Sequence, residues 1–278
     1  MKTDLSDRLF DDSPSLFELN PSKLQCYLDC PKQYRFRYID KRPERRAFGP
    51  SALGRSVHKA LRDFYAMEPD ERTIDNLLRA LRRAWDGIGY RSAKEAEDAF
   101  SRAEDMLRRY HAGTNPQDVR VVAMESKFSR AFSSNGVLVT GRVDRIDNVN
   151  GEYVIVDYKT GRFGSDDIVL NESLPLSLYA IAVSAVMGRD VSRIAVEHLP
   201  TGRRAETWRS LERLDHDWTK LTGLVGEMRP GAEFPARPGS LCRWCDYLVA
   251  CPEGRRSLRV ENAPPEDEDV PPLLDDDY

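Results

Sequence analysis

The spacing of apolar residues predicts several amphipathic helices. The stretch from about Ser51 to Met67 has apolar residues three or four positions apart, which places them on one helical face. These residues are Leu53, Val57, Leu61 and Phe64. Apolar spacing and helix-start residues predict further helices in these stretches: residues 21–30, two within about 73–113, residues 175–187 and residues 211–228.

Strand character lies in segments rich in β-branched residues. These segments are residues 121–128, 136–149, 152–159, 194–199 and 206–209. Helices come first, then a block of strands, then a helix and more strands, and this order favours an α/β class. The chain has no internal repeat, no G-x-x-x-x-G-K-[ST] and no G-x-G-x-x-G. Its sequence therefore disfavours a P-loop motor or a dinucleotide site.

A predicted hairpin brings charged residues together within apolar strands. Asn150-Gly151 between two strand-like runs is a strong signal for a two-residue turn. Counting outward from this turn places Asp144 opposite Asp157, and the period of two places Lys159 on the same face. Two carboxylates this close repel each other unless a cation lies between them. The hairpin therefore predicts a metal site with a lysine beside it.

Glu125 and two simpler interpretations remain open at this point. If Asn135-Gly136 starts a second hairpin, Glu125 lies near Asp144, where it would either assist metal binding or form a salt bridge. Lys159 could also pair with Asp157 for structural reasons alone. Asp144, which has Arg142 and Arg145 as neighbours in the chain, could form a surface ion pair.

Charge is unevenly distributed along the 278 residues. The formal net charge is −4, but the segment from Glu261 to the end carries eight acidic residues and no basic ones, so the rest of the chain is about +4. This basic body is compatible with a phosphate-bearing partner. The acidic, proline-rich residues 255–278 are expected to be a disordered tail, and residues 1–17 a flexible N-terminus. The N-terminus lacks a signal peptide and no segment could span a membrane, so we expect a cytoplasmic protein without a membrane partner.

The cysteines predict a second metal centre. Cys242, Cys245 and Cys251 form a C-x2-C-x5-C pattern, which directs several thiols toward one point. A fourth ligand must come from Cys26 or Cys30, about 200 residues earlier. Zinc or an iron–sulfur cluster could be held in this way, and either would fasten the N-terminal helix to the C-terminal end.

Together these motifs resemble the PD-(D/E)XK nuclease superfamily, specifically its RecB-like exonucleases with a C-terminal iron–sulfur cysteine cluster. The resemblance rests on the following motifs: Cys30-Pro31, Gly54-x-x-Val57-His58, Gly141-Arg142-x-Asp144, Asp157-Tyr158-Lys159-Thr160-Gly161, and Phe234-Pro235 through Cys251-Pro252. It implies a restriction-endonuclease-like core, with a mixed central sheet flanked by helices, an N-terminal helical region and a cysteine-clustered C-terminal end. It also implies a single nuclease domain over residues 18–254, with a helical insertion at about 73–113.

The resemblance assigns roles to individual residues. His58, Asp144 and Asp157, with the carbonyl of Tyr158, match the ligands of the catalytic metal, which is Mg²⁺ or Mn²⁺. Lys159 matches the lysine that positions water and stabilises charge on the phosphate. The implied ligands of a [4Fe–4S] cluster, with structural Zn²⁺ as the alternative, are Cys30, Cys242, Cys245 and Cys251.

One position departs from the family pattern. The family often has a Gln-x-x-x-Tyr motif on the helix after the D-x-K strand; here Tyr179 is present, but Pro175 replaces the glutamine. Tyr179 remains a candidate for contacting DNA in the active site. The implied function is a metal-dependent DNA exonuclease or single-strand nuclease in repair or recombination, with a helicase or other repair subunit as a candidate partner. The alternatives are a non-catalytic iron–sulfur DNA-binding subunit and a nuclease of CRISPR spacer acquisition.

Overall fold

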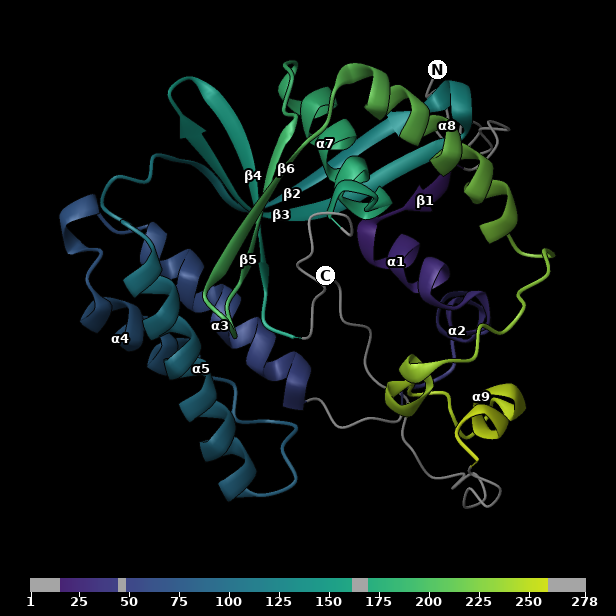
Figure 1. Ribbon diagram of the computed structural model, residues 1–278, viewed down its shortest axis with the longest axis horizontal. Coiled ribbons are helices and arrows are strands. Elements are labelled where there is room, and N and C mark those ends of the chain that lie inside the picture. The colour runs from purple at the N-terminus through teal and green to yellow at the C-terminus, as the bar shows by residue number, and fades with distance from the viewer. Residues whose placement is uncertain (1–15, 45–48, 162–169, 260–278) are drawn as a thin grey trace, which may run out of the picture.

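A mixed six-stranded sheet forms the centre of the chain (Figure 1). The computed structural model describes residues 16–44, 49–161 and 170–259. The strands are β1 (Phe17–Leu19), β2 (Val121–Phe132), β3 (Val137–Val149), β4 (Glu152–Lys159), β5 (Arg193–His198) and β6 (Arg203–Trp208). Their order is β1-β3-β4-β5-β6, and β2 also pairs with β3.

The long strand β3 pairs with β2 along one edge and with two shorter strands, β1 and β4, along the other. β2 runs antiparallel to β3 from Val137 to Asp147. On the other edge, β1 pairs in parallel with residues 137–139 and β4 pairs antiparallel with residues 145–149. Between these two stretches no described strand pairs with that edge of β3. The sheet is therefore open there, next to Asp144.

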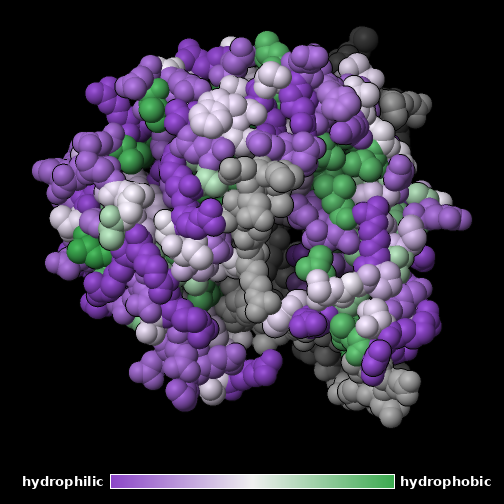
Figure 2. All heavy atoms as spheres, in the orientation of Figure 1, coloured by the Kyte–Doolittle hydropathy of each residue, from purple (hydrophilic) through white to green (hydrophobic). Residues whose placement is uncertain are grey.

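Helices cover both faces of the sheet (Figure 1). One face packs against α3 (Gly49–Tyr65), α4 (Ile74–Ala84) and α5 (Ala93–Gly113). The other packs against α1 (Pro21–Asp29), α7 (Leu174–Met187) and α8 (Leu211–Met228). The alternation of β4 explains this arrangement, because Val154 and Val156 face the first group of helices and Ile155 faces the second. Hydrophilic side chains dominate the surface over α3–α5 (Figure 2).

The predicted fold class is confirmed: the chain has a restriction-endonuclease-like core in which helices flank a mixed sheet. The helices expected within residues 21–30, 73–113, 175–187 and 211–228 are present. Their starts follow from local chemistry; for example, Asn20 Oδ1 accepts a hydrogen bond of 2.8 Å from the backbone amide of Lys23 at the start of α1. The domain boundaries at residues 17 and 254 stay predictions, and residues 1–15 and 260–278 of the two expected flexible ends lie outside the described residues.

The sequence predicted neither β1 nor the short helical elements within residues 31–39 and 240–257. β1 lies within the stretch where the sequence predicted no element, because three residues pairing with a strand more than 100 positions away leave no periodic signal. After α2 (Pro31–Tyr34), the chain continues as a π-helical turn, Arg35–Ile39. The C-terminal end holds a short 3-10 helix, Ser240–Trp244, and α9 (Pro252–Ser257). In the described ranges, no helix combines the length and apolar character needed to span a bilayer.

Candidate active site and cysteine cluster

The predicted hairpin forms with the predicted register. Val149 pairs with Glu152, and the ladder continues to Arg145 opposite Val156. Asn150 and Gly151 have φ values of 55° and 93°, as a two-residue primed turn requires. Asp144 and Asp157 come one step beyond the last paired residues, at the point where β3 parts from β4. Instead of a strand pair, the amide of Tyr158 donates a hydrogen bond of 2.8 Å to Asp144 Oδ2.

β2 is irregular at the same level. The ladder pairs Met124 with Arg145 and Ser126 with Val143, so Glu125 lies opposite Asp144. Glu125 has a φ of 45°, in the left-handed region that residues with a side chain rarely adopt. The alternation changes across it, because Met124 packs on the side of α3–α5 whereas Phe128 packs on the side of α7. Such backbone strain persists only where the surroundings enforce it, and it concentrates at functional sites.

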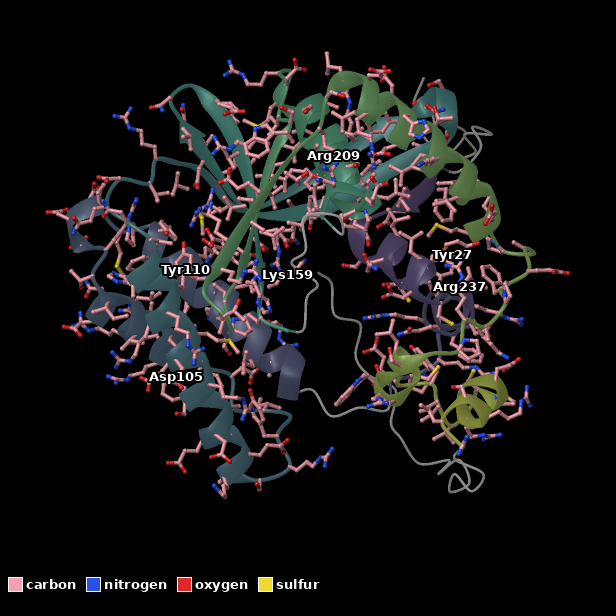
Figure 3. All side chains as sticks on the ribbon, viewed as in Figure 1. Tyr27, Asp105, Tyr110, Lys159, Arg209 and Arg237 are labelled. Atoms are coloured by element: carbon pink, nitrogen blue, oxygen red, sulfur yellow. The ribbon has the colours of Figure 1, made fainter. Side chains whose placement is uncertain are left out.

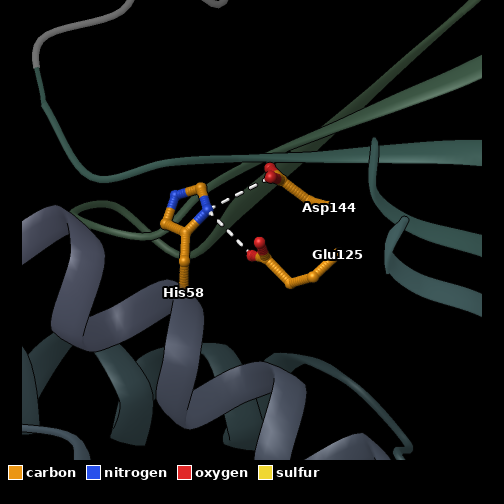
Figure 4. Close-up of side chains that lie close together, drawn as sticks. All are labelled: His58, Glu125 and Asp144. Atoms are coloured by element: carbon orange, nitrogen blue, oxygen red, sulfur yellow. Dashed lines mark hydrogen bonds and ion pairs between the residues drawn. The ribbon is translucent and has the colours of Figure 1, made fainter. Parts of the chain in front are cut away.

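His58 completes a group of three potential metal ligands (Figure 4). It projects from α3, and its Nδ1 lies 3.2 Å from Asp144 Oδ1 and 3.8 Å from Glu125 Oε1. Among the described residues this is the only group of three whose ligand atoms all lie within 4.8 Å of one another. Although burial lowers the pKa of His58, the neighbouring carboxylates, led by Asp144, raise it overall. For Asp144, His58 and the Tyr158 amide outweigh burial and lower the pKa.

Asp157 and Lys159 form an ion pair beside this group. Lys159 Nζ lies 2.8 Å from Asp157 Oδ2, with Asp157 buried and the lysine side chain 38% exposed. Burial raises the pKa of Asp157, and the nearby charge of Asp144 adds to the increase. Burial alone would lower the pKa of Lys159, but the Asp157 carboxylate raises it, so the ammonium form is favoured. In the view of Figure 3, Lys159 lies between the helical side that carries Tyr110 and the side that carries Arg237.

Arg142 and Tyr179 border the same site. Arg142 Nε lies 2.8 Å from Glu125 Oε2, so Arg142 pairs with Glu125 rather than with its near neighbour Asp144. The hydroxyl of Tyr179 donates a 3.2 Å hydrogen bond to the carbonyl of Arg142, and its ring meets Phe128 edge-on. Burial, with the charges of Asp157 and Asp144, raises the pKa of Tyr179, which therefore remains a hydrogen-bond donor. Pro175 lies in the first turn of α7, where proline is tolerated.

A buried arginine next to Asp144 links the strands of the site to the helices packed on them. Arg145 is 1% exposed and lies 2.8 Å from Asp147 through its Nε. Its guanidinium also donates to the hydroxyls of Tyr110 and Tyr158, and its centre lies 4.3 Å from the ring centroid of Tyr65. The sequence suggested that Arg145 could pair with Asp144; in the structure it pairs instead with Asp147 and is buried against α3 and α5.

The four predicted cysteine ligands line one cavity. Cys30 lies between α1 and α2, and the other three lie in the C-terminal segment: Cys242, Cys245 and Cys251. The sulfurs accept backbone hydrogen bonds of 3.4 Å from three amides, those of Arg237, Gly239 and Gly254. Gly254 packs against two of these sulfurs: a Cβ at this position would lie 3.5 Å from the sulfur of Cys242 and 3.5 Å from that of Cys251.

Cys26 is set apart from this cavity. It is buried in the hydrophobic core formed by α1, α7 and α8. Burial raises the pKa of Cys26 to about 12, but it also raises the pKa of the cavity cysteines Cys245, to about 11, and Cys251. The position of Cys26 in the core, and not its pKa, therefore separates it from the four cysteines of the cavity. Arg237 ties the two ends of the chain together, because its guanidinium donates a 2.6 Å hydrogen bond to the carbonyl of Leu28. Lys32 and Glu253 add an ion pair of 2.8 Å.

Sequence reasoning left the role of Glu125 open and missed the partners of two arginines, Arg142 and Arg145. A second hairpin at Asn135-Gly136 was the signal that predicted Glu125 near Asp144. The structure connects the two strands through residues 133–136, places Glu125 opposite Asp144 and brings its carboxylate to His58. The partners of Arg142 and Arg145 carried no such signal, because both depend on how β2 and β3 bend. The roles assigned to the individual residues stay predictions.

Comparisons with known proteins give the chain a family. The sequence model of the PD-(D/E)XK nuclease superfamily matches residues 18–252. Gene 69 protein of Mycobacterium phage D29 is 25% identical over 182 residues, which are 60% of this chain and 64% of the relative, so the match spans less than two thirds of that protein. A crystal structure of a protein from Eubacterium rectale, provisionally described as an exonuclease, has a TM-score of 0.51 at 12% identity and covers 97% of both chains. That likeness supports the fold. The chain belongs to the PD-(D/E)XK nuclease superfamily.

Proposed function

We propose that the chain is a divalent-metal-dependent nuclease that hydrolyses phosphodiester bonds in DNA, as an exonuclease or single-strand nuclease in repair or recombination. One observation carries this proposal. His58, Glu125 and Asp144 converge beside the Asp157–Lys159 pair, where β3 parts from β4. Family membership and this cluster of charges at an opening in the sheet support the same chemistry.

The donor set fits a divalent cation. It offers the imidazole of His58 and the carboxylates of Glu125, Asp144 and Asp157, with the carbonyl of Tyr158 as a further proposed ligand. Oxygen-rich sites suit Mg²⁺ or Mn²⁺, and an imidazole favours Mn²⁺. When bound, such an ion neutralises phosphate charge and makes water a stronger nucleophile. Asp144 holds the imidazole of His58 in place, since its Oδ1 lies 3.2 Å from His58 Nδ1.

Lys159 and Tyr179 are the proposed non-ligand residues of the site. The ammonium of Lys159 is held by Asp157 at 2.8 Å and is partly exposed, so it can face the phosphate and stabilise charge that develops there. Tyr179 keeps its proton and anchors the backbone of Arg142, beside the metal ligands. We assign it to placing the nucleic acid.

We further propose that the cysteine cavity holds a [4Fe–4S] cluster, as in the RecB-like branch. The amide hydrogen bonds to three sulfurs support an anionic thiolate site. One tetrahedral zinc ion would draw four sulfurs to about 3.8 Å from one another. No three of the cysteine sulfurs, all of which lie in the described ranges, are within 4.8 Å of one another, which favours a larger cluster. Analysis of anaerobically purified protein should find about four irons with inorganic sulfide per chain, whereas stoichiometric zinc contradicts the cluster.

Cleavage assays test the nuclease proposal. Labelled single-stranded, duplex and circular DNA, with an RNA of the same sequence, are incubated with Mg²⁺ or Mn²⁺. We expect degradation of linear DNA, and a circular single strand distinguishes an exonuclease, which leaves it intact, from an endonuclease. Asp157→Asn and Lys159→Met should each lower the rate by about 100-fold or more.

Lys220→Met is the matched control, because Lys220 is an exposed lysine on α8. It should cleave like the wild type. A wild-type protein that is inert on every substrate with both metals would contradict the nuclease proposal. Binding of DNA without cleavage would instead support a non-catalytic DNA-binding subunit.

A further inference from the structure

Among the described residues, no helix covers one face of β2 and β3, the face that begins at the candidate metal site. On their covered face, Phe128 packs against Tyr179 of α7, and Phe132 packs against Trp218 of α8. Side chains alternate along a strand, so Lys127 and Ser129 point to the opposite face. Both are exposed, as is Ala131, the next residue on that face.

The uncovered face carries a pair of opposed cations. Lys127 lies directly opposite Arg142, and Ser129 lies opposite Thr140. Like charges in directly opposed positions destabilise a sheet unless an anion lies between or above them. Lys127 has no ion-pair partner in the part of the chain that the structure describes. Arg142 holds Glu125 through Nε, yet 43% of its side chain is exposed, and a guanidinium has five donors.

This cationic pair lies next to the candidate metal ligands on the same face of the sheet. Arg142 and Asp144 are two residues apart on β3, which corresponds to about 7 Å along the strand. Ser129 adds an exposed hydroxyl group one step further out, whereas the hydroxyl of Thr140 donates a 2.9 Å hydrogen bond to Glu18 Oε1. The carboxylate of Glu18 has a counter-charge of its own, since Lys23 Nζ lies 3.7 Å from Glu18 Oε1.

We propose that this face, defined by Lys127, Ser129 and Arg142, binds the phosphate backbone of the nucleic-acid strand next to the scissile phosphate. The inference rests on the proposed nuclease function and extends it. Cations and hydroxyls suit phosphate contacts, which position a strand without reading its sequence. A protein partner would need an apolar centre, and this face offers only the small side chain of Ala131 among its exposed residues.

Arg130 provides a matched control for Lys127. It is exposed on the same strand and has the same charge, but it shares the face of Phe128, where α7 and α8 pack. Lys127→Ala and Arg130→Ala remove one positive charge each from β2. Only the first removes it from the proposed nucleic-acid surface. Both positions are exposed, so neither change should lower stability by more than about 0.5 kcal/mol.

Fluorescence anisotropy with a labelled 20-nucleotide single strand, with Ca²⁺ replacing the catalytic metal, measures binding across a range of salt concentrations. Lys127→Ala should raise Kd about three- to tenfold at low salt. It should also reduce the slope of log Kd against log salt by about 0.7, the value for one lost phosphate contact in a single strand. Arg130→Ala should change neither quantity. DNA and RNA strands of the same sequence should respond alike, because the contacts are to phosphate.

Two outcomes separate this inference from the nuclease proposal. If the wild type cleaves DNA but Lys127→Ala binds as tightly as Arg130→Ala, with the same salt slope, the surface is overturned and the nuclease remains. If the wild type neither binds nor cleaves nucleic acid, the nuclease proposal is overturned, and the surface with it.

Discussion

Glu125 occupies the most constrained position among the candidate metal ligands. Its backbone has a φ of 45°, and its two carboxylate oxygens have different partners. Oε1 lies 3.8 Å from His58 Nδ1, and Oε2 lies 2.8 Å from Arg142 Nε. One side chain therefore connects the candidate metal-binding group with the cation that borders it.

Replacement of Glu125 by glutamine tests whether this carboxylate binds the metal. Glu125→Gln keeps the shape of the side chain but removes its charge, so we expect the Mn²⁺ dissociation constant to rise about tenfold or more. Electron paramagnetic resonance of Mn²⁺ without DNA measures this directly. Glu212→Gln, at an exposed position in the first turn of α8, should leave Mn²⁺ binding unchanged. Unaltered binding in Glu125→Gln would exclude Glu125 and leave Asp157 as the additional carboxylate ligand.

At the residue scale, the sequence predicted which charged side chains meet but not all of their partners. Turn chemistry placed Asp144 level with Asp157, because a two-residue Asn-Gly turn sets the register of its strands. It could not predict that Tyr158 would donate its amide to Asp144, since that bond exists only because β3 and β4 separate there. The separation itself depends on packing against helices far away in the chain.

Arg145 links three elements that the sheet alone would not hold together. Its guanidinium, on β3, contacts Tyr158 of β4, Tyr110 of α5 and Tyr65 of α3. The hydroxyls of Tyr65 and Tyr110 meet at 2.5 Å. Since α3 also carries His58, this buried network fixes the helix that delivers the imidazole to the strand that delivers Asp144.

Removal of the buried counter-charge should destabilise this junction strongly. Asp147→Ala leaves the guanidinium of Arg145 without its carboxylate, and we expect a loss of about 3–5 kcal/mol in the free energy of unfolding. The double variant Arg145→Met/Asp147→Leu should recover most of that loss, because it removes both charges. Urea denaturation followed by circular dichroism measures each value.

Lys94→Ala serves as the comparison for an exposed pair, since Lys94 meets Asp98 one helical turn away on the surface of α5. Its effect should stay below about 0.5 kcal/mol. A cost of less than 1 kcal/mol for Asp147→Ala would show that the Arg145 network does not hold α3 and α5 to the sheet.

Elements with a strong local period were predictable, and elements defined by distant pairing were not. α8 runs from Leu211 to Met228, as its apolar spacing indicated. β1 pairs with residues 137–139 of β3, and a three-residue strand has too few positions to show alternation. The irregularity of β2 at Glu125 was equally hidden, because it reflects the combined packing of two helical layers.

At the scale of the whole molecule, the cysteine cluster joins the two ends of the domain. Cys30 approaches the C-terminal segment next to Arg237, which bonds to Leu28, and Lys32 pairs with Glu253. On the face seen in Figure 2, the surface is hollowed between this side and the side of α3–α5. A cluster at the cysteines would therefore fix one side of the molecule relative to the sheet that carries the candidate metal ligands.

Cys30 and Cys26 provide a matched pair for testing this joint. Cys30 lines the cavity and accepts an amide hydrogen bond, whereas Cys26 is buried in the hydrophobic core. Cys30→Ser should abolish iron binding and lower Tm by several degrees, because a ligand that binds only the folded chain contributes directly to its stability. Cys26→Ala should retain the iron of the wild type and cost only about 1 kcal/mol from the small cavity it leaves. Iron analysis and differential scanning calorimetry of anaerobic samples measure both effects. Iron that persists in Cys30→Ser and disappears in Cys26→Ala would reverse the assignment, and the N-terminal ligand would then lie one helical turn earlier in α1.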